Sequence, residues 1–359
     1  RASVAERVQA LRRDDPGLVP SLYIIQVGQD GASSTYIRMK RQAAEECGIR
    51  CTHVALPVGT SEENIIEVVR DLNADPEVDG ILVQLPLVTD IDSEGERRVV
   101  ETVDASKDVD GFHSLNIGKL ASRAANPHFV PCTPAGVMRL LQVAGLDDLA
   151  GLHAVVMGRS DIVGSPVAHL LRAHHCTVTQ VHRYTRDVQR YLALADIVVV
   201  AIGQPRFVKG EWLKPGALVI DVGTNYVPDA TRKSGQRLVG DVDFDSAVSV
   251  ASAITPVPGG VGPMTVAMLM ENVLLSASRR AEARAKKPRG VATRNPISPQ
   301  NPVPSDIEVA RQQKPKRITQ LANEIGLLPS ELEPHGDVKA KVALSVLERL
   351  KHRTNGKYI

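Results

Sequence analysis

The stretch His153–Leu171, HAVVMGRSDIVGSPVAHLL, decides the fold. The apolar run after His153 predicts a buried strand, Gly158 and Gly164 predict a tight turn, and the residues that follow have helical periodicity. A strand, a glycine turn and a helix in this order are typical of the opening of a dinucleotide-binding unit. Ser160 stands where the second glycine of the usual fingerprint would be, so this motif alone is a weak signal.

Later segments strengthen this interpretation. Three further strands are predicted at CTVTQVH (176–182), ADIVVVAIG (195–203) and ALVIDVG (217–223), and the last two end in glycine turns, where an α/β sheet binds ligands. An NAD site normally has an acidic residue at the end of the second strand, for the ribose 2′-hydroxyl. This chain has His182 and Arg183 there, and with Arg159 they favour a 2′-phosphate and therefore NADP.

The first 150 residues also alternate strands and helices. Strands are predicted at 21–28, 52–57 and 79–87, with helices at 34–47 and 62–73. A long helix follows a glycine- and proline-rich loop at 263–283. We therefore expect an α/β protein of two domains, an N-terminal α/β catalytic domain (1–135) and a Rossmann-type domain (136–262), each with a mostly parallel sheet.

Composition limits the class of protein. The chain has 359 residues, 43% hydrophobic residues, only 3% aromatic residues and a net charge of +2, which calls for neither nucleic acid nor an anionic membrane as partner. No apolar run approaches the length of about 20 residues that a membrane span needs. Four cysteines make no dense disulfide framework and favour a reducing compartment. No metal site is predicted, and a start at Arg1 rather than Met suggests a fragment or a processed form.

The last 75 residues change in character. Residues 284–304 are rich in Arg, Lys and Pro and read as a linker, although a nucleic-acid tail is the alternative that their charge allows. Residues 305–359 have helical periodicity but are too few for a domain of their own. The final KYI resembles the beginning of a strand, so we expect a third domain that is cut off.

The predicted helix at 34–47 has a lysine on its apolar face. Helical spacing puts Tyr36 and Lys40 on one stripe with Ala43, Ala44 and Cys47. Such a lysine either extends along its stem to water or sits in a cleft, where it can shuttle a proton. Tyr36, one turn earlier, fits a flat ligand stacked on its ring, but it also fits ordinary core packing.

Three other segments favour the cleft. Gln84 interrupts the apolar strand GILVQLPL between Val83 and Leu85, and a buried amide needs partners. Asp110 in KDVDGF is suited to the donor edge of a guanidine-like heterocycle. The run TPVPGGVGPMT (255–265) combines three prolines and three glycines in eleven residues, which favours a rigid backbone close to a flat ligand.

Together these motifs resemble the bifunctional methylenetetrahydrofolate dehydrogenase/cyclohydrolase family, in the form found at the front of trifunctional C-1-tetrahydrofolate synthases. The likeness covers about residues 1–285 and is carried by YIRMK, VQLPL, KDVDG, PCTP, GRSDIVGSP and TPVPGGVGPMT. The segment from NPVPSDIEVA to KYI is similar to the start of a formate-tetrahydrofolate ligase domain. A fragment that ends there is expected to lack ligase activity.

The resemblance implies a role for each candidate residue. Lys40 would be the catalytic lysine of the cyclohydrolase step, Gln84 would position it, and Tyr36 would stack on the folate. Asp110 would anchor the pterin, and the rest of the folate site in the cleft between the domains would come from Ser33, Val83, Leu85, Pro258, Gly259 and Gly260. Gly158, Arg159 and Ser160 would hold the cofactor, with His182 and Arg183 nearby. The helix at 263–283 would pack back onto the first domain.

Cofactor choice and partners follow from the same likeness. Arg183 resembles the mitochondrial NAD-linked branch, where an arginine works with phosphate and magnesium, but His175 replaces the acidic residue of that branch. NADP is therefore the first choice and NAD the alternative. Tetrahydrofolate derivatives, a homodimer and a cytoplasmic location, with mitochondria as the alternative, are expected. A catalytically silent dimerisation platform and another α/β dehydrogenase are the competing hypotheses.

Overall fold

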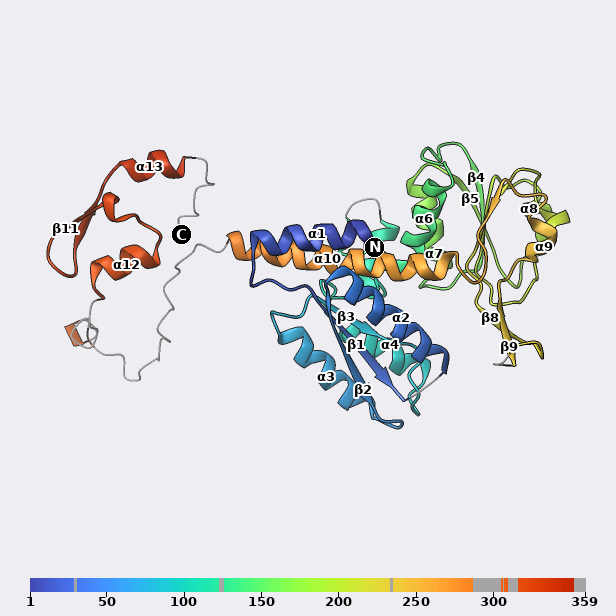
Figure 1. Ribbon diagram of the computed structural model, residues 1–359, viewed down its shortest axis with the longest axis horizontal. Helices are drawn as coiled ribbons and strands as arrows, with labels where there is room; N and C mark the ends of the chain where they lie inside the picture. The colour runs from blue at the N-terminus through green and yellow to red at the C-terminus, as the bar shows by residue number, and fades with distance from the viewer. Residues whose placement is uncertain are drawn as a thin grey trace. The chain divides into compact units, whose positions relative to one another are not determined.

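The computed structural model describes residues 1–28, 31–122, 126–232, 235–286, 305, 307–308 and 316–351, without the side chains of 31–34 and 285–286. The chain divides into two compact units, Arg1–Arg279 (unit 1) and Arg280–Ile359 (unit 2). Unit 1 contains two parallel sheets, one in an amino-terminal lobe and one in a Rossmann-type lobe (Figure 1). The predicted α/β class is confirmed.

The amino-terminal lobe has a three-stranded parallel sheet in the order β2–β1–β3. Its elements are α1 (Ala2–Asp14), β1 (Ser21–Val27), α2 (Gly31–Cys47), β2 (Arg50–Leu56), α3 (Glu62–Ala74), β3 (Gly80–Val83), α4 (Ser93–Thr102) and α5 (Ser114–Ala121). Ile24 pairs with His53 on one side and with Leu82 on the other. Because side chains alternate along a strand, this sheet is covered on both faces.

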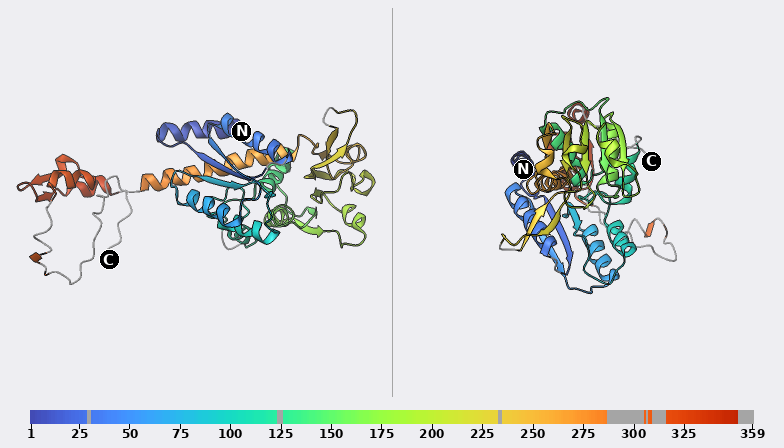
Figure 2. Two further views of the ribbon diagram at one scale, coloured as in Figure 1. Left: turned by 90° about the horizontal axis from the view of Figure 1, so that it is seen from below. Right: turned by 90° about the vertical axis from the view of Figure 1, so that its right-hand side faces the viewer.

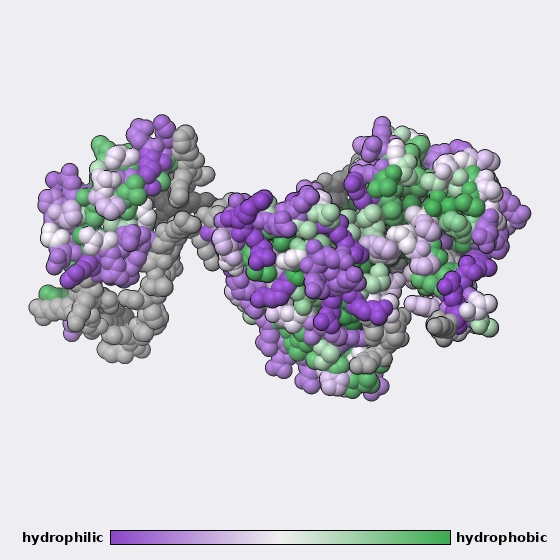
Figure 3. Space-filling view, viewed as in Figure 1, coloured by the Kyte–Doolittle hydropathy of each residue, from purple (hydrophilic) through white to green (hydrophobic). Residues whose placement is uncertain are grey.

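Two apolar cores form on these faces. Ile24 on one face packs with α1 and α2, and Ile25 on the other packs with α3 and α4. Local capping starts two of these helices: the Ser61 hydroxyl accepts from the Asn64 amide at α3, and the Asp92 carboxylate accepts from the Gly95 amide at α4. In Figure 3 the outer face over α1 and α2 is mostly hydrophilic, as expected for helices that bury one stripe.

The Rossmann-type lobe has a five-stranded parallel sheet in the order β10–β7–β6–β4–β5. Its elements are α6 (Cys132–Val143), β4 (His153–Met157), α7 (Gly164–Ala173), β5 (Thr177–Val181), α8 (Val188–Leu192), β6 (Ile197–Val200), η1 (Gly210–Trp212), β7 (Leu218–Asp221), α9 (Phe244–Ala247) and β10 (Ala253–Ile254). A hairpin of β8 (Asn225–Pro228) and β9 (Gln236–Val239) extends from it. Figure 2 shows both lobes from two further sides.

Helix α10 (Val261–Lys286) links the two lobes. Its buried side chains, among them Met270 and Val273, complete the core between α1 and α2. The Asn272 amide donates to the carbonyls of Val109 (2.9 Å) and Val130 (3.0 Å), and Arg7 of α1 pairs with Glu271. By length and composition this helix is long and apolar enough to cross a membrane, which was not predicted from the sequence. However, half of its apolar segment is buried inside the protein, as in a core helix.

Unit 2 is small. It contains α12 (Ile318–Glu324), η2 (Pro329–Glu331), β11 (Leu332–Pro334), β12 (Ala340–Val342) and α13 (Ser345–Leu350). Arg349 binds the buried Glu331 carboxylate through two bonds of 2.6 Å, and these bonds lower the pKa of Glu331 to about 2. Most of the predicted linker and the final KYI lie outside the described residues.

Candidate active site

A cavity of about 350 Å³ lies where α2, the end of β3, the 107–112 turn and the start of α10 meet the Rossmann-type lobe. Its lining residues are Tyr36, Lys40, Val83, Gln84, Leu85, Asp110, Phe112, Thr133, Ile162, Val163, Val222, Thr224, Val261, Gly262, Thr265 and Val266. Six of the residues that the sequence singled out for a ligand cleft therefore share one cavity. Its volume is in the range of small-molecule sites.

Lys40 and Gln84 are in direct contact in this cavity. The Lys40 ammonium, on a side chain only 9% exposed, donates to Gln84 Oε1 at 2.9 Å. Gln84 Nε2 donates to the Leu85 carbonyl at 2.9 Å, and the Gln84 backbone amide donates to Ile25. Because both ends of the Gln84 amide are engaged, its oxygen is held toward the lysine. The lysine is thus fixed in a cleft rather than extended along the surface to water.

Tyr36 and Asp110 bring a ring and a carboxyl group to the same cavity. Burial raises the pKa of the Tyr36 phenol, as does Tyr226, whereas a hydrogen bond with Thr224 of the Rossmann-type lobe opposes the shift. Burial also raises the pKa of Asp110, against the charge of Lys40 and a hydrogen bond from Cys132. The site therefore holds an acceptor carboxyl, and the charge of the Lys40 ammonium acts on it.

The neighbouring Asp108 shapes the turn that presents Asp110. Its carboxylate accepts from the backbone amides of Gly111, Phe112 and His113 at 2.9–3.2 Å and from Asn116 Nδ2 at 2.9 Å. Burial raises the pKa of Asp108 to about 6 in spite of these bonds. Of the two aspartates in KDVDGF, one holds the turn together and the other faces the cavity.

Four predicted folate-site residues are not among the described residues that line this cavity. Ser33 belongs to α2, but its side chain lies outside the described residues. Pro258, Gly259 and Gly260 form the turn before α10, closed by a bond from the Gly260 amide to the Pro256 carbonyl. The cavity meets the first turn of α10 instead, at Val261, Gly262, Thr265 and Val266.

Several lining residues were missed by the sequence reasoning, although the motifs contained them. Thr133 belongs to PCTP and Thr265 to TPVPGGVGPMT, and their hydroxyl groups are 3.1 Å apart. Ile162 and Val163 belong to the GRSDIVGSP turn, and Val222 and Thr224 follow β7. Strand ends and turns were the available signal for these positions.

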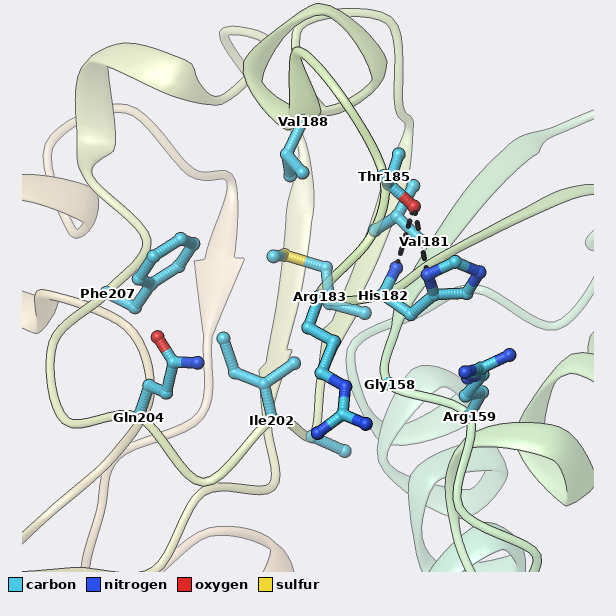
Figure 4. A pocket seen from close by; sticks show the side chains of 12 residues that line it. Gly158, Arg159, Val181, His182, Arg183, Thr185, Val188, Ile202, Gln204 and Phe207 are labelled. Atoms are coloured by element: carbon cyan, nitrogen blue, oxygen red, sulfur yellow. Dashed lines mark hydrogen bonds between the residues drawn. The ribbon is translucent and has the colours of Figure 1, made fainter.

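A second cavity, of about 610 Å³, lies at the carboxyl edge of the Rossmann-type sheet. It is lined by Met157, Gly158, Arg159, Val181, His182, Arg183, Thr185, Val188, Ala201, Ile202, Gln204 and Phe207 (Figure 4). Gly158 has φ +116°, and a Cβ there would lie 2.2 Å from the Ala201 carbonyl oxygen. The backbone can therefore turn closely around a ligand only because this position is glycine.

The charges of this cavity match a phosphorylated ligand. Arg159 and Arg183 both line it, and their guanidinium groups lie 5.9 and 4.8 Å from the Tyr184 ring centre. Figure 4 shows both at the Gly158 end of the cavity, opposite Gln204 and Phe207. His182 lines it too, with Nδ1 facing the Tyr184 amide at 3.3 Å. Close backbone and cationic groups at a sheet edge fit a dinucleotide.

Ser160 has a different place in this turn. Its hydroxyl accepts from the amides of Val163 (3.2 Å) and Gly164 (3.3 Å) at the start of α7, and it does not line the cavity. Gly164 packs so closely that a Cβ would lie 2.4 Å from the Gly158 carbonyl oxygen. The serine that breaks the glycine fingerprint thus supports the turn that leads into α7.

A buried carboxylate that the sequence reasoning missed supports the opposite wall. Asp241, which is fully buried, accepts from the amides of Ile202 (2.7 Å) and Gly203 (2.9 Å) and from Asn225 Nδ2 (2.8 Å). Asp221 in turn accepts from the Asp241 amide at 2.9 Å. These bonds fix the loop after β6, which carries Ile202 into the cavity.

Models of known protein families match the segments of the chain that form both cavities. Residues 1–110 match the model of the tetrahydrofolate dehydrogenase/cyclohydrolase catalytic domain, and residues 131–281 match its NAD(P)-binding domain. Residues 304–359 match formate–tetrahydrofolate ligase. The three matched segments follow one another in the order that the sequence predicted.

Individual relatives extend the comparison. The chain is 50% identical to the cytoplasmic C-1-tetrahydrofolate synthase of Saccharomyces cerevisiae over 367 residues and 48% identical to its mitochondrial counterpart over 359 residues. Each alignment covers all of this chain, which spans only 38% and 36% of the length of those relatives.

The alignment with a solved structure covers a larger share of the other chain than the alignments with these two relatives. The N5,N10-methylenetetrahydrofolate dehydrogenase-cyclohydrolase of Trypanosoma brucei, complexed with NADP cofactor and inhibitor, is 44% identical, with a TM-score of 0.74. The alignment covers 77% of this chain and 93% of that one. With two matching family models and a relative covered almost throughout, this chain belongs to the tetrahydrofolate dehydrogenase/cyclohydrolase family.

Proposed function

We propose that this chain oxidises 5,10-methylenetetrahydrofolate to the 5,10-methenyl form with NADP, and then hydrolyses the methenyl form to 10-formyltetrahydrofolate. The observation that carries the proposal is the Lys40–Gln84 pair at 2.9 Å, in one cavity with Tyr36 and Asp110. The residue types fit a folate: a ring to stack on, a carboxyl for the pterin edge and an amine for proton transfer. Membership of a catalytic family and the intact residue set disfavour a silent dimerisation platform.

The dehydrogenase step needs orientation more than acid–base chemistry. When bound, the nicotinamide supplies a hydride acceptor for the methylene carbon. Gly158 with the cationic groups of Arg159 and Arg183 would hold the dinucleotide, while Tyr36 and Asp110 would hold the folate ring. Because Thr224 and Val222 bring the Rossmann-type lobe to the folate cavity, both lobes contribute to the alignment of the two rings.

The cyclohydrolase step needs a group that moves protons. Water adds to the methenyl carbon and loses a proton. The resulting hydroxyl group then loses its own proton to form the formyl C=O, as the bond from that carbon to N5 breaks and N5 gains a proton. Lys40 is the basic side chain of the cavity among the described residues, and Gln84 holds it in place. General acid–base catalysis of this kind contributes about 10²–10⁴-fold in rate.

Replacement of the lysine tests the assignment. We expect Lys40→Met, which keeps the length of the side chain, to lower the cyclohydrolase rate by about 10²–10⁴-fold and the dehydrogenase rate much less. The methenyl form should therefore accumulate, which its absorbance reports. Lys209→Met is the matched control, because Lys209 makes only a surface pair with Asp243 at 3.1 Å. An undiminished cyclohydrolase rate in Lys40→Met would overturn the role of the lysine.

NADP is our choice of cofactor. The basic residues Arg159, His182 and Arg183 support it, because these side chains suit a 2′-phosphate and no acidic side chain lines the described cavity to bind a ribose 2′-hydroxyl. Initial rates with NADP should exceed those with NAD supplemented with phosphate and magnesium. Faster turnover with NAD under those conditions would favour the mitochondrial, NAD-linked form.

The remaining expectations concern the whole protein. We infer that folate binding belongs mainly to residues 1–135 with the helix at 263–283, and cofactor binding to residues 136–262. We also propose a cytoplasmic homodimer, with the full-length protein carrying formate–tetrahydrofolate ligase activity; the match at residues 304–359 supports the ligase part. Relatives occur in both the cytoplasm and mitochondria, so fractionation of cells that express the full-length protein tests the location. Sedimentation equilibrium tests the dimer.

A further inference from the structure

A third cavity lies outside both sites described above. It has a volume of about 840 Å³ and opens at the carboxyl ends of β1 and β2, beneath the amino-terminal half of α2. It is lined by Gln26, Gly28, Ile37, Arg38, Arg41, His53, Ala55, Leu56, Pro57 and Val58. The carboxyl edge of a parallel sheet is where α/β proteins place ligands.

This cavity is separate from the folate cavity. The two share no lining residue. Successive residues of a helix are rotated by about 100°, so α2 turns Tyr36 and Lys40 toward one cavity and Ile37 and Arg41 toward the other. The folate cavity lies toward the end of β3, whereas this one lies toward β2 on the other side of the central strand.

A buried amide faces the third cavity with one end unused. Gln26 is only 5% exposed, and its Oε1 is 3.0 Å from His53 Nε2. Its Nε2 is buried and has no hydrogen-bond partner among the residues that the structure describes. Buried donors are nearly always paired, and an unpaired one destabilises the protein. A ligand acceptor at this point would complete the amide.

Among the described residues that line the cavity, the charged side chains are both cationic. Arg38 and Arg41 line it, and within the described ranges no carboxylate forms an ion pair with either. Burial and the charge of Arg41 together lower the pKa of His53, which also lines the cavity. His53 is therefore a neutral partner of Gln26 at pH 7, and the two guanidinium groups set the sign of the field.

The rest of the wall is apolar. Ile37 is buried, while Leu56, Pro57 and Val58 form an open shelf on which Val58 is 68% exposed. A small inorganic ion would leave this shelf in contact with water. The lining is suited to a molecule with an oxyanion at one end and an apolar body at the other.

We propose that this cavity is a second ligand site, which binds an organic anion with a phosphate or carboxylate group. Arg38 and Arg41 bind the oxyanion by charge-assisted hydrogen bonds, and Gln26 Nε2 donates to it. The apolar body of the ligand lies on the shelf at 56–58. The proposal is independent of the folate and cofactor assignments.

The test is calorimetric titration of the intact chain with three probes of the same ring. Phenyl phosphate and benzoate carry the two candidate oxyanions, and benzyl alcohol is the uncharged control. We expect saturable binding of at least one anion and none of the alcohol. The Arg38→Gln/Arg41→Gln double variant should bind about tenfold or more weakly, because two charge-assisted bonds are lost. Its two side chains are exposed, so the fold should persist.

Three comparisons locate the binding. Arg70→Gln, on the exposed surface of α3, should leave it unchanged. Arg183→Gln should also leave it unchanged, whereas a loss in this variant would place the anion in the dinucleotide cavity and overturn the proposal. Gln26→Leu should weaken binding several-fold, because it removes the amide group that donates to the anion. Absence of binding by both anions, or equal binding by the double variant, would likewise overturn it.

Discussion

At the scale of the residue, the surroundings of Lys40 determine how its role is interpreted. On the sequence alone a lysine among small apolar residues has two interpretations, and its helix does not separate them. The structure places Gln84 Oε1 at 2.9 Å and Asp110 in the same cavity. These partners come from other elements, 44 and 70 positions along the chain, so no local pattern reveals them.

Replacement of Gln84 should distinguish a role in positioning Lys40 from a role in packing alone. We expect Gln84→Leu to lower the cyclohydrolase kcat by about 10–100-fold, because a hydrogen bond to a charged group contributes about 1.5–3 kcal/mol. Gln84→Glu keeps an acceptor toward Lys40 and should lose less of that rate. Single-turnover hydrolysis of the methenyl substrate measures both. If Gln84→Leu turned over as fast as the parent chain, the amide would have no positioning role.

The carboxyl group of Asp110 leads to a prediction of how folate affinity depends on pH. Its carboxylate is the form that accepts from a donor edge, and burial raises its pKa above the usual value for aspartate. Folate affinity should therefore begin to fall, as the pH is lowered, at a higher pH than an ordinary aspartate would cause. Fluorescence titration from about pH 8 down to about pH 4 measures this across the ordinary aspartate range. Asp110→Asn should bind weakly with no such dependence, and a matching pH profile in this variant would contradict the assignment.

At the scale of the element, turns determine the geometry of both cavities. The predicted strand at 79–87 ends at Val83, and Gln84 and Leu85, which follow it, line the folate cavity. Helix α10 begins at Val261, two residues before the predicted start, and its first two turns line the cavity directly after the Pro258–Gly260 turn. Periodicity located these segments, but it did not show which residues of a turn face inward.

The Asp108 turn should be a major source of local stability. We expect Asp108→Asn to lower the free energy of unfolding by about 2–4 kcal/mol, because the new amide turns a donor toward groups that already donate. Urea unfolding measures the change. Asp148→Asn is the control, since this exposed carboxylate accepts only from the Ala150 amide. Equal effects of the two substitutions would show that the Asp108 network contributes little.

The Gly158 turn predicts a change in cofactor binding. Gly158→Ala adds a Cβ 2.2 Å from the Ala201 carbonyl oxygen at φ +116°, a conformation that costs about 1–3 kcal/mol for residues other than glycine. NADP affinity and melting temperature should both fall. Gly145→Ala is matched, with φ +88° and no atom within 4 Å of the added Cβ. Both variants share the backbone strain, so only an additional loss of NADP affinity in Gly158→Ala reflects the close packing.

At the scale of the whole molecule, long-range contacts were the part that sequence patterns predicted least. Alternating strands and helices were sufficient for the α/β class and for two successive parallel sheets. The resemblance, rather than periodicity, implied that α10 returns to the first lobe, where Asn272 bonds to Val109 and Val130. The cavity at Gln26 and His53 was not predicted, because its residues are unremarkable until β1 and β2 lie side by side.

The division into two units leads to the last prediction. Every described residue that lines the folate and dinucleotide cavities lies between Tyr36 and Val266, and the buried part of α10 ends at Ala277. A chain that ends after Lys286 therefore keeps both sites and the core that supports them. We expect its dehydrogenase and cyclohydrolase values of kcat/KM to equal those of the 359-residue chain, measured side by side with a thermal melt. A loss of about tenfold or more, which corresponds to 1.4 kcal/mol, would show that residues 287–359 stabilise the catalytic unit.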